Sequence, residues 1–441
     1  MKDKRHLLIR IAGLGAGALG AVLLLACSAS EPANAQNEGV VHVASAHELE
    51  LAVRAARPGT RIILADGDYQ PVRISNLNAA GNPVTITAEN PLKARMSGMN
   101  ITNSDGLIID GLHFRATGPA VLFFNTGARN MLLVNSLISG VNHNRNPWDD
   151  EGRGVRILGA ERITIAHNLF EDLKVALTMR ESEGVRVHRN SFQWLREGIN
   201  IARSKNGALT ANYLTEFHPN YAKGEHPDAI QFWVAREPEG SHNFLIARNV
   251  MIFGENRAVQ GIFIRSETER REIPQIRHSN FLIEHNIYYG SSAHGITANS
   301  VEGVRINNNV VVGSPFSKTN GNVDRTGDGR GSRGFTPGIR ARFGSGAIFE
   351  RNVSMAPISM EPDGREADNV VLNPVRGMGK PRNAILAGPI TEDLPSLDRF
   401  VTKNPQLRAR SIGLLDPFPY GAGQTDPAAN LQEAIAVHKT P

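Results

Sequence analysis

The chain repeats a short segment in which apolar and polar residues alternate and an asparagine follows the run. Clear copies are RITIAHNLF (162–170), GVRVHRNSF (184–192) and NFLIARNVM (243–251). An apolar residue at every second position predicts a β-strand, because a helix would need apolar residues three and four positions apart. We therefore expect strands that each end in a turn at the asparagine.

The spacing of the asparagines predicts how these strands stack. Asn168, Asn190 and Asn212 follow one another at intervals of 22 residues. A period of this length holds one coil of short strands and turns, so the expected fold is an all-β solenoid, the parallel β-helix. Asparagine tolerates left-handed turns, and its amide can form a ladder from coil to coil, which gives it a structural role. The full set is Asn168, Asn190, Asn212, Asn249, Asn286, Asn309 and Asn352.

Some intervals between these asparagines are longer. Asn249 and Asn286 each follow the preceding asparagine of the set by 37 residues, and Asn352 follows Asn309 by 43 residues. The extra residues predict insertions at turns. Insertions in solenoids collect on one face and often carry the binding site.

Both ends of the predicted solenoid are expected to be covered. At the N-terminal end, Ser45-Ala46-His47-Glu48 has the form of a capping box that opens a short helix. The helix would shield the first coil from solvent. We place the β-helix at 40–355, and we expect residues 356–441, which lose the coil pattern and gain proline, to cap or wrap its C-terminal end.

A second strand begins about ten residues after many of the asparagines, and its outward positions carry arginine, amide and tryptophan side chains. Stacking of coils about 4.8 Å apart would bring these side chains into one column. Arginine binds carboxylates in bidentate fashion, amides bind hydroxyl groups and an indole can lie against a sugar ring, so the column is expected to bind a linear sugar acid. An ordinary solvated face is the alternative. The predicted substrate-binding residues are Arg180, Arg203, Asp228, Gln231, Trp233 and Asn299.

The densest group of titratable side chains is NYAKGEHPDAIQFW (220–233), which lies in one of the insertions. Tyrosine, lysine and histidine are common proton-transfer groups, so Tyr221, Lys223 and His226 are candidate catalytic residues. Asp228 would orient His226 or bind a hydroxyl group. A turn with a solvated histidine is the structural alternative.

Composition narrows the classes of function. The 441 residues are 41% hydrophobic and 21% charged, as in a globular protein. The net charge is +5, and residues 1–26 hold +3 of it, so the remainder is too weakly basic to coat nucleic acid. Cys27 is the single cysteine, which excludes an intrachain disulfide and a zinc–cysteine cluster.

The N-terminal residues predict an export signal. Residues 1–10 are basic and 11–25 are apolar, a run too short to span a membrane but suited to a secretory signal peptide. Leu24-Leu25-Ala26-Cys27 resembles a bacterial lipobox. The resemblance implies cleavage after residue 26, acylation of Cys27 and a lipid-anchored location at the bacterial outer membrane or in the periplasm. Residues 27–39 show no apolar periodicity and are expected to form a flexible tether. An ordinary signal peptide is the alternative.

The chain resembles the right-handed parallel β-helix polysaccharide lyases and their relatives, the alginate lyases, chondroitinase-B-like enzymes and mannuronan epimerases. The resemblance rests on 43–70, 82–98 and 105–114 together with the asparagine coils. It implies a lyase activity, and calcium in many members.

Two features depart from the family pattern. Alginate lyases of this type use a Lys–Arg pair on adjacent coils, but Arg180 stands where the lysine is expected, and Arg203 lacks a following histidine. Epimerase relatives carry Asp-Pro-His, whereas this chain has the reversed order at 226–228. The catalytic assignment therefore rests on the 220–233 segment.

These observations together predict a polysaccharide lyase that cleaves a uronate-containing polymer by β-elimination. Arg265, with other arginines and amides, would neutralise the uronate carboxylate. His226 is the first choice of base and Lys223 the second, while Tyr221 would protonate the leaving oxygen. A hydrolase using Asp228 with Glu197 or Glu225, a C5-epimerase and a non-catalytic carbohydrate-binding lipoprotein are the alternatives. We expect a monomer that binds no nucleic acid.

Overall fold

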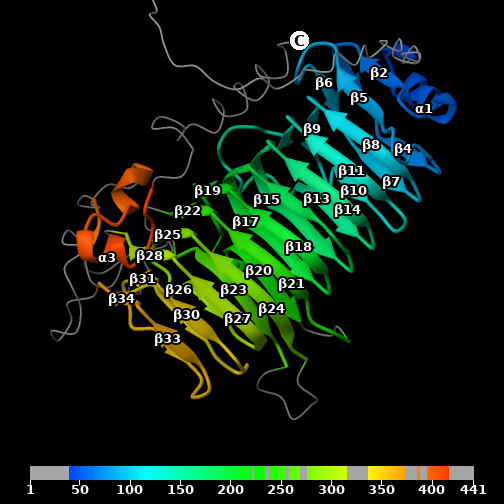
Figure 1. Ribbon diagram of the computed structural model, residues 1–441. Coiled ribbons are helices and arrows are strands. Elements are labelled where there is room, and N and C mark those ends of the chain that lie inside the picture. Colours follow the sequence, from blue (N-terminus) through cyan, green and yellow to red (C-terminus); the bar gives the residue numbers. More distant parts are fainter. Residues whose placement is uncertain are drawn as a thin grey trace, which may run out of the picture. The chain divides into compact units, whose positions relative to one another are not determined.

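The structure is a computed structural model that describes residues 39–220, 223–225, 227–234, 238–253, 258–268, 276–314, 336–372, 385–387 and 395–416. Residues 39–441 form one compact unit. Within the described residues every pair of named strands is parallel, and successive strands of each stack come from successive coils (Figure 1). The predicted parallel β-helix is confirmed.

Three stacks of strands form the walls, here called the first, second and third faces. The first face is a separate sheet. Its strands are β1 (Val40–Val43), β2 (Arg61–Leu64), β5 (Val84–Ala88), β8 (Asp105–Asp110), β11 (Arg129–Val134), β14 (Glu161–Ala166), β16 (Arg186–His188), β18 (Lys205–Thr210), β21 (His242–Ala247), β24 (His278–Glu284), β27 (Val301–Asn307), β30 (Ile348–Glu350) and β33 (Arg365–Ala367).

The second and third faces belong to one sheet, because the long strands β15 (Leu169–Arg180) and β17 (Ser191–Ala202) run through both. The other strands of the second face are β3 (Gly67–Tyr69), β6 (Ala94–Met96), β9 (His113–Ala116), β12 (Leu137–Gly140), β19 (Tyr213–Thr215), β22 (Val250–Ile252), β25 (Ile287–Gly290), β28 (Val310–Gly313), β31 (Val353–Ser354) and β34 (Val370–Val371). The other strands of the third face are β4 (Val72–Ser75), β7 (Met99–Thr102), β10 (Leu122–Phe124), β13 (Arg153–Leu158), β20 (Asp228–Val234), β23 (Gln260–Ser266), β26 (His294–Ala298), β29 (Gly338–Ala341) and β32 (Ser359–Met360).

The core lies between the three faces and follows the predicted alternation. On β15, β17, β20, β23 and β26 of the third face, the apolar side chains at alternate positions, which point inward, are all buried. They include Leu177, Met179, Ile199, Ile201, Ile230, Phe232, Ile262, Ile264 and Ile296. Phenylalanine rings also stack from coil to coil, as in the pair Phe170 and Phe192, whose centroids are 4.7 Å apart. This apolar interior supplies most of the driving force for folding.

The predicted asparagine ladder is confirmed at the turn between the first and second faces. From Asn190 onward each amide oxygen accepts hydrogen bonds from the backbone and side-chain nitrogens of the preceding asparagine, as Asn249 does from Asn212 at 3.1 and 2.9 Å. The ladder continues beyond Asn352 to Asn369. Strand pairing likewise runs past the expected boundary at residue 355, to Val371, because the short last coil keeps its asparagine although its alternation is weak.

Both ends carry added structure. Helix α1 (Ala46–Ala55) begins with the predicted capping box, since Ser45 Oγ accepts from the Glu48 backbone nitrogen at 3.2 Å. It buries Leu49 and Val53, and Ala52 and Ala56 pack partly buried against the same core.

Near the C-terminus, η4 (Leu397–Phe400) and α3 (Pro405–Ala409) belong to a segment that packs on the outside of the second face. That face is apolar there, with Tyr289 against Phe400 at 5.8 Å. No helix in the described residues is long and apolar enough to cross a membrane.

Candidate functional site

The richest polar region lies at the corner where the second face turns into the third. Two long connections, 141–152 between β12 and β13 and 216–227 between β19 and β20, leave the coils at this corner. The second of them holds most of the predicted catalytic segment. As predicted for solenoid insertions, these loops share one side of the coils.

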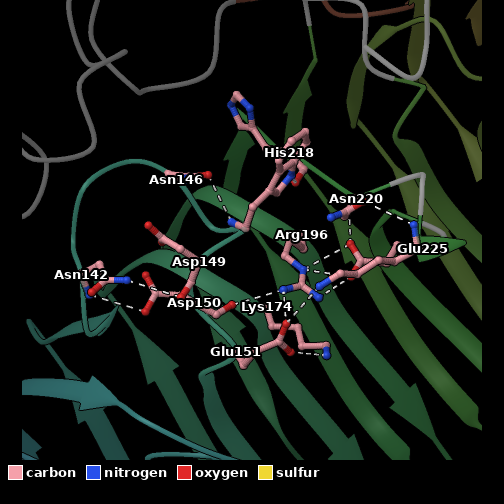
Figure 2. Close-up of polar contacts among 12 residues, drawn as sticks. Asn142, Asn146, Asp149, Asp150, Glu151, Lys174, Arg196, His218, Asn220 and Glu225 are labelled. Atoms are coloured by element: carbon pink, nitrogen blue, oxygen red, sulfur yellow. Dashed lines mark hydrogen bonds and ion pairs between the residues drawn. The ribbon is translucent and has the colours of Figure 1, made fainter. Parts of the chain in front are cut away.

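Arg196 ties the two loops together (Figure 2). Its side chain is 2% exposed, and its Nε lies 3.0 Å from Glu225 Oε1, while its Nη1 lies 2.9 Å from Glu151 Oε1. Lys174, at the matching position one coil earlier, also pairs with Glu151. The expectation that the chain lacks a lysine and an arginine on adjacent coils is therefore wrong, because Lys174 and Arg196 stand in this arrangement. The hydrogen bonds from Lys174 and Arg196 lower the pKa of Glu151 to about 2, so this carboxylate is ionised at neutral pH.

Lys223 lies at the edge of this cluster. Its Nζ is 3.9 Å from Glu151 Oε1 and its side chain is 60% exposed, so it is accessible to a ligand. The other two predicted proton-transfer residues, Tyr221 and His226, lie outside the described residues. Their catalytic roles stay predictions.

The third face carries the predicted outward column. Register places Asn200 beside Gln231, Gln231 beside Phe263, and Trp233 beside Arg265. The column continues one coil further than predicted, since Thr297 pairs with Arg340. Thr297 is fully buried, and His294 Nδ1 lies 2.9 Å from its hydroxyl group.

His294 is a neutral base among cations. Burial, followed by the charges of Arg340 and Arg265, lowers the pKa of its imidazole to about 4. The Phe263 ring packs edge-on against it at 4.9 Å. An imidazole that stays unprotonated at neutral pH beside guanidinium groups can accept a proton from a bound anion.

Two carboxyl groups meet beneath the same face. Asp228 is fully buried, and burial followed by the charge of Glu197 raises its pKa well above the ordinary value. Burial also raises the pKa of Glu197, against the hydrogen bond from Asn200. Gln231 Nε2 donates to Asp228 Oδ2 at 2.8 Å. Asp228 is therefore placed to orient Gln231 rather than to touch a solvent-borne substrate.

Oxygen atoms suited to a hard cation gather around this pair. Asp228 Oδ1, Asn200 Oδ1 and Gln260 Oε1 are buried without a hydrogen-bond partner among the described residues. Carboxylate and amide oxygens are calcium ligands, so the residues fit the calcium that the family resemblance implies. No group of three or more histidine, cysteine or acidic side chains in the described ranges is arranged to hold a metal, so amide oxygens would have to complete the set.

The remaining predicted residues lie at the far edge of the third face. Arg180 Nε and Arg203 Nη1 both lie 3.1 Å from Glu181 Oε1, so the two guanidinium groups share one carboxylate. Asn299 Oδ1 accepts from the Arg342 backbone nitrogen at 3.1 Å. Nearer His294, Arg265 Nη2 lies 3.8 Å from Glu267 Oε2, and Arg340 Nη2 donates to the Ala293 carbonyl oxygen at 3.1 Å.

Sequence reasoning missed Arg196, Glu151 and Arg340. Arg196 carried a usable signal, because it repeats the basic residue Lys174 after one 22-residue period. Glu151 lies near the end of the 141–152 connection, and Arg340 follows another insertion of irregular length, so no periodic pattern placed them.

Comparison with protein-family models gives a match for this chain. Residues 43–145 match the family model described as Chondroitinase B, which confirms the resemblance seen in the N-terminal coils. Comparison with curated protein sequences found no significant match.

Several solved structures are similar to this chain. The alginate lyase AlyGC of the PL6 family is 13% identical with a TM-score of 0.45, covering 88% of this chain and 58% of its own. A mannuronic acid-specific family 6 lyase from human gut microbiota is 17% identical with a TM-score of 0.43, covering 75% of this chain and 82% of its own. The A-module of the Azotobacter vinelandii mannuronan C-5 epimerase AlgE4 is 12% identical with a TM-score of 0.46, covering 74% of this chain and 90% of its own. The chain therefore spans a little over half of the first of these proteins.

Proposed function

We propose that this protein is a polysaccharide lyase that cleaves an acidic, uronate-containing polysaccharide, such as alginate or a glycosaminoglycan, by β-elimination. The observation that carries the proposal is the neutral imidazole of His294 beside two arginines, Arg265 and Arg340, on an outward face. The match of residues 43–145 to the chondroitinase B family supports it.

The chemistry follows from the charges. The proton on C5 of a uronate is weakly acidic until the adjacent carboxylate is neutralised, which Arg265 and Arg340 would do by charge and hydrogen bonding. His294 would accept the C5 proton, a double bond would form between C4 and C5, and the bond from C4 to the glycosidic oxygen would break. Tyr221, which lies outside the described residues, is the proposed acid for that oxygen, while Lys223 and His226 stay alternative bases.

The other candidate reactions differ in their products. A glycoside hydrolase is favoured by the paired Glu197 and Asp228, but an inverting or retaining mechanism needs both carboxyl groups at the sugar, and Asp228 is fully buried. A C5-epimerase would use the same base and return the proton to the opposite side of the ring without shortening the polymer.

The test incubates purified protein with alginate, polymannuronate, chondroitin, heparin and pectin, with and without a chelator. A lyase produces unsaturated chain ends that absorb ultraviolet light, a hydrolase produces reducing ends without that absorbance, and an epimerase changes only the NMR spectrum of the polymer. The variants His294→Gln and Arg265→Ala should lose at least about 100-fold in rate. Arg186→Ala, on the exposed first face, is the matched control and should keep the wild-type rate. Wild-type rates in both site variants would refute the assignment.

We also propose that the protein is anchored through lipid on Cys27 at the bacterial outer membrane or in the periplasm. The support is the lipobox-like sequence, since residues 1–38 lie outside the described residues. In a detergent phase-separation experiment the wild type should enter the detergent phase and Cys27→Ser the aqueous phase. Equal partitioning of the two would contradict the anchor.

A further inference from the structure

An aromatic cluster at the corner of the second and third faces has no role in the proposed reaction. Trp148 and Arg145 come from the 141–152 loop, Trp194 from the bend of β17, and His218 from the 216–227 loop. The indole of Trp148 is one of the few large apolar side chains left exposed among the described residues, at 47%. A single exposed apolar side chain is ordinary, but this indole lies in a group of aromatic rings with a cation beside them, which a ligand could contact.

The contacts hold this cluster in place. Trp148 Nε1 donates to the His218 carbonyl oxygen at 2.7 Å, which joins the two loops. The rings of Trp194 and His218 stack with centroids 4.7 Å apart and planes 18° apart. The Arg145 guanidinium lies 5.9 Å from the centroid of the Trp194 ring.

The backbone of two residues in this cluster is held in a strained conformation. Trp194 and Arg145 both have positive φ, at 52° and 63°, a conformation that is unfavourable for residues other than glycine. Asp172 Oδ2 accepts from the Arg145 backbone nitrogen at 2.9 Å and stabilises this turn. The buried Arg196, which pairs with both loops, fixes them further. The cluster is therefore preorganised, and a ligand would lose little free energy in ordering it.

The chemistry of the cluster selects an acidic sugar. The face of an indole is electron-rich, so it attracts the C–H bonds that project from one side of a pyranose ring. Arg145 adds a positive charge beside these rings, which favours a carboxylate or sulfate on the same sugar. A flat apolar ring with one neighbouring cation matches a single residue of an anionic polysaccharide.

The position of the cluster suits a distal subsite. Trp194 lies on β17, and His294 lies on β26, three coils further along the third face through β20 and β23. At about 4.8 Å per coil the separation along the stack is about 14 Å. A short oligosaccharide laid across the coils can span this distance.

We propose that Trp148, Trp194, His218 and Arg145 form an aromatic subsite that binds a pyranose ring of an acidic polysaccharide, several sugars away from the bond that is cleaved. The choice of polymer rests on the proposed lyase function, but binding at this subsite does not depend on catalysis.

The experiment compares wild type, Trp148→Ala, Trp148→Phe and Leu51→Ala by electrophoresis in gels that contain alginate, chondroitin sulfate or neutral dextran. Leu51, an exposed apolar residue on α1, is the matched control. Trp148→Ala should weaken binding to an acidic polymer by roughly three- to tenfold. Trp148→Phe, which keeps an aromatic face, should recover most of the binding, and Leu51→Ala should match wild type. Circular dichroism checks that each variant is folded.

Kinetics with substrates of different length test the aromatic subsite separately from the proposed lyase activity. With a lyase substrate, Trp148→Ala should raise KM for long chains and leave KM for disaccharides unchanged, because a disaccharide placed at His294 is shorter than the separation of about 14 Å. Unchanged binding and KM in Trp148→Ala, with wild-type cleavage, would overturn the subsite and leave the lyase proposal intact. A binding loss without any cleavage by wild type would support the subsite and refute the lyase. Failure of wild type to bind any of the acidic polymers would overturn the subsite.

Discussion

Replacing Asn249 by alanine tests the physical basis of the coil stack. The Asn249 side chain is fully buried in the ladder. Its Nδ2 donates to the Leu209 carbonyl oxygen at 2.9 Å and to Asn286 Oδ1 at 3.0 Å, and its Oδ1 accepts from the backbone and side-chain nitrogens of Asn212. Alanine removes all four hydrogen bonds.

The expected loss in the free energy of unfolding depends on which groups lose their hydrogen-bond partners. Asn286 Oδ1 keeps the bond from the Asn249 backbone nitrogen, and Asn212 Nδ2 keeps its bond to Val187. The backbone N–H of Asn212 is left buried without its acceptor, which costs about 1–3 kcal/mol, and each further lost bond adds about 0.5–1.5 kcal/mol. Together these losses should lower the free energy of unfolding by about 3–7 kcal/mol.

The assay is urea unfolding followed by both circular dichroism and tryptophan fluorescence, because stacked coils can unfold in more than one step. Asn243→Gly is the control. Asn243 belongs to an exposed ladder with Asn206 and Asn280, and glycine accepts its φ of 59° without strain. The control should lose under about 1 kcal/mol. A loss in Asn249→Ala no larger than in the control would refute the buried ladder as a source of stability.

Three further outcomes are expected. If His294 is the base, kcat/KM should decrease as the pH falls, with an apparent pKa near 4, which is the pKa of His294 in the substrate-free enzyme. A decrease in kcat/KM with an apparent pKa near 6.5 would contradict the assignment. His278 is buried with its pKa lowered to about 4, so the unfolded chain binds a proton more readily. Stability should therefore drop as pH falls from about 6.5 to about 4, by about 3 kcal/mol for this group, and His278→Gln should flatten the drop in pH-dependent unfolding. Calcium titration calorimetry should show weaker binding to Asp228→Asn and Glu197→Gln than to wild type, and equal binding would place any calcium elsewhere.

The stack of coils could be predicted from the amino-acid sequence because it depends on a local pattern that repeats along the chain. Alternating apolar residues predict which side chains enter a core, and an asparagine every 22 residues predicts where one coil turns above the next. The same rules predicted the inward residues, the ladder, the capping box of α1, and the neighbours Asn200, Gln231 and Trp233 on the third face. The lipid anchor and the roles of Tyr221 and His226 stay predictions.

The arrangement at the corner of the second and third faces was decided by tertiary structure. Whether Asp228 reaches solvent or is buried near Glu197 depends on a connection of irregular length that no period describes. The 141–152 and 216–227 loops bring Arg196 to Glu151 and Glu225, and Trp148 to His218, across separations of 29 to 70 residues. Periodicity therefore determined the coils, because each coil repeats the same local burial, while the charges and rings at the corner depended on packing between distant segments.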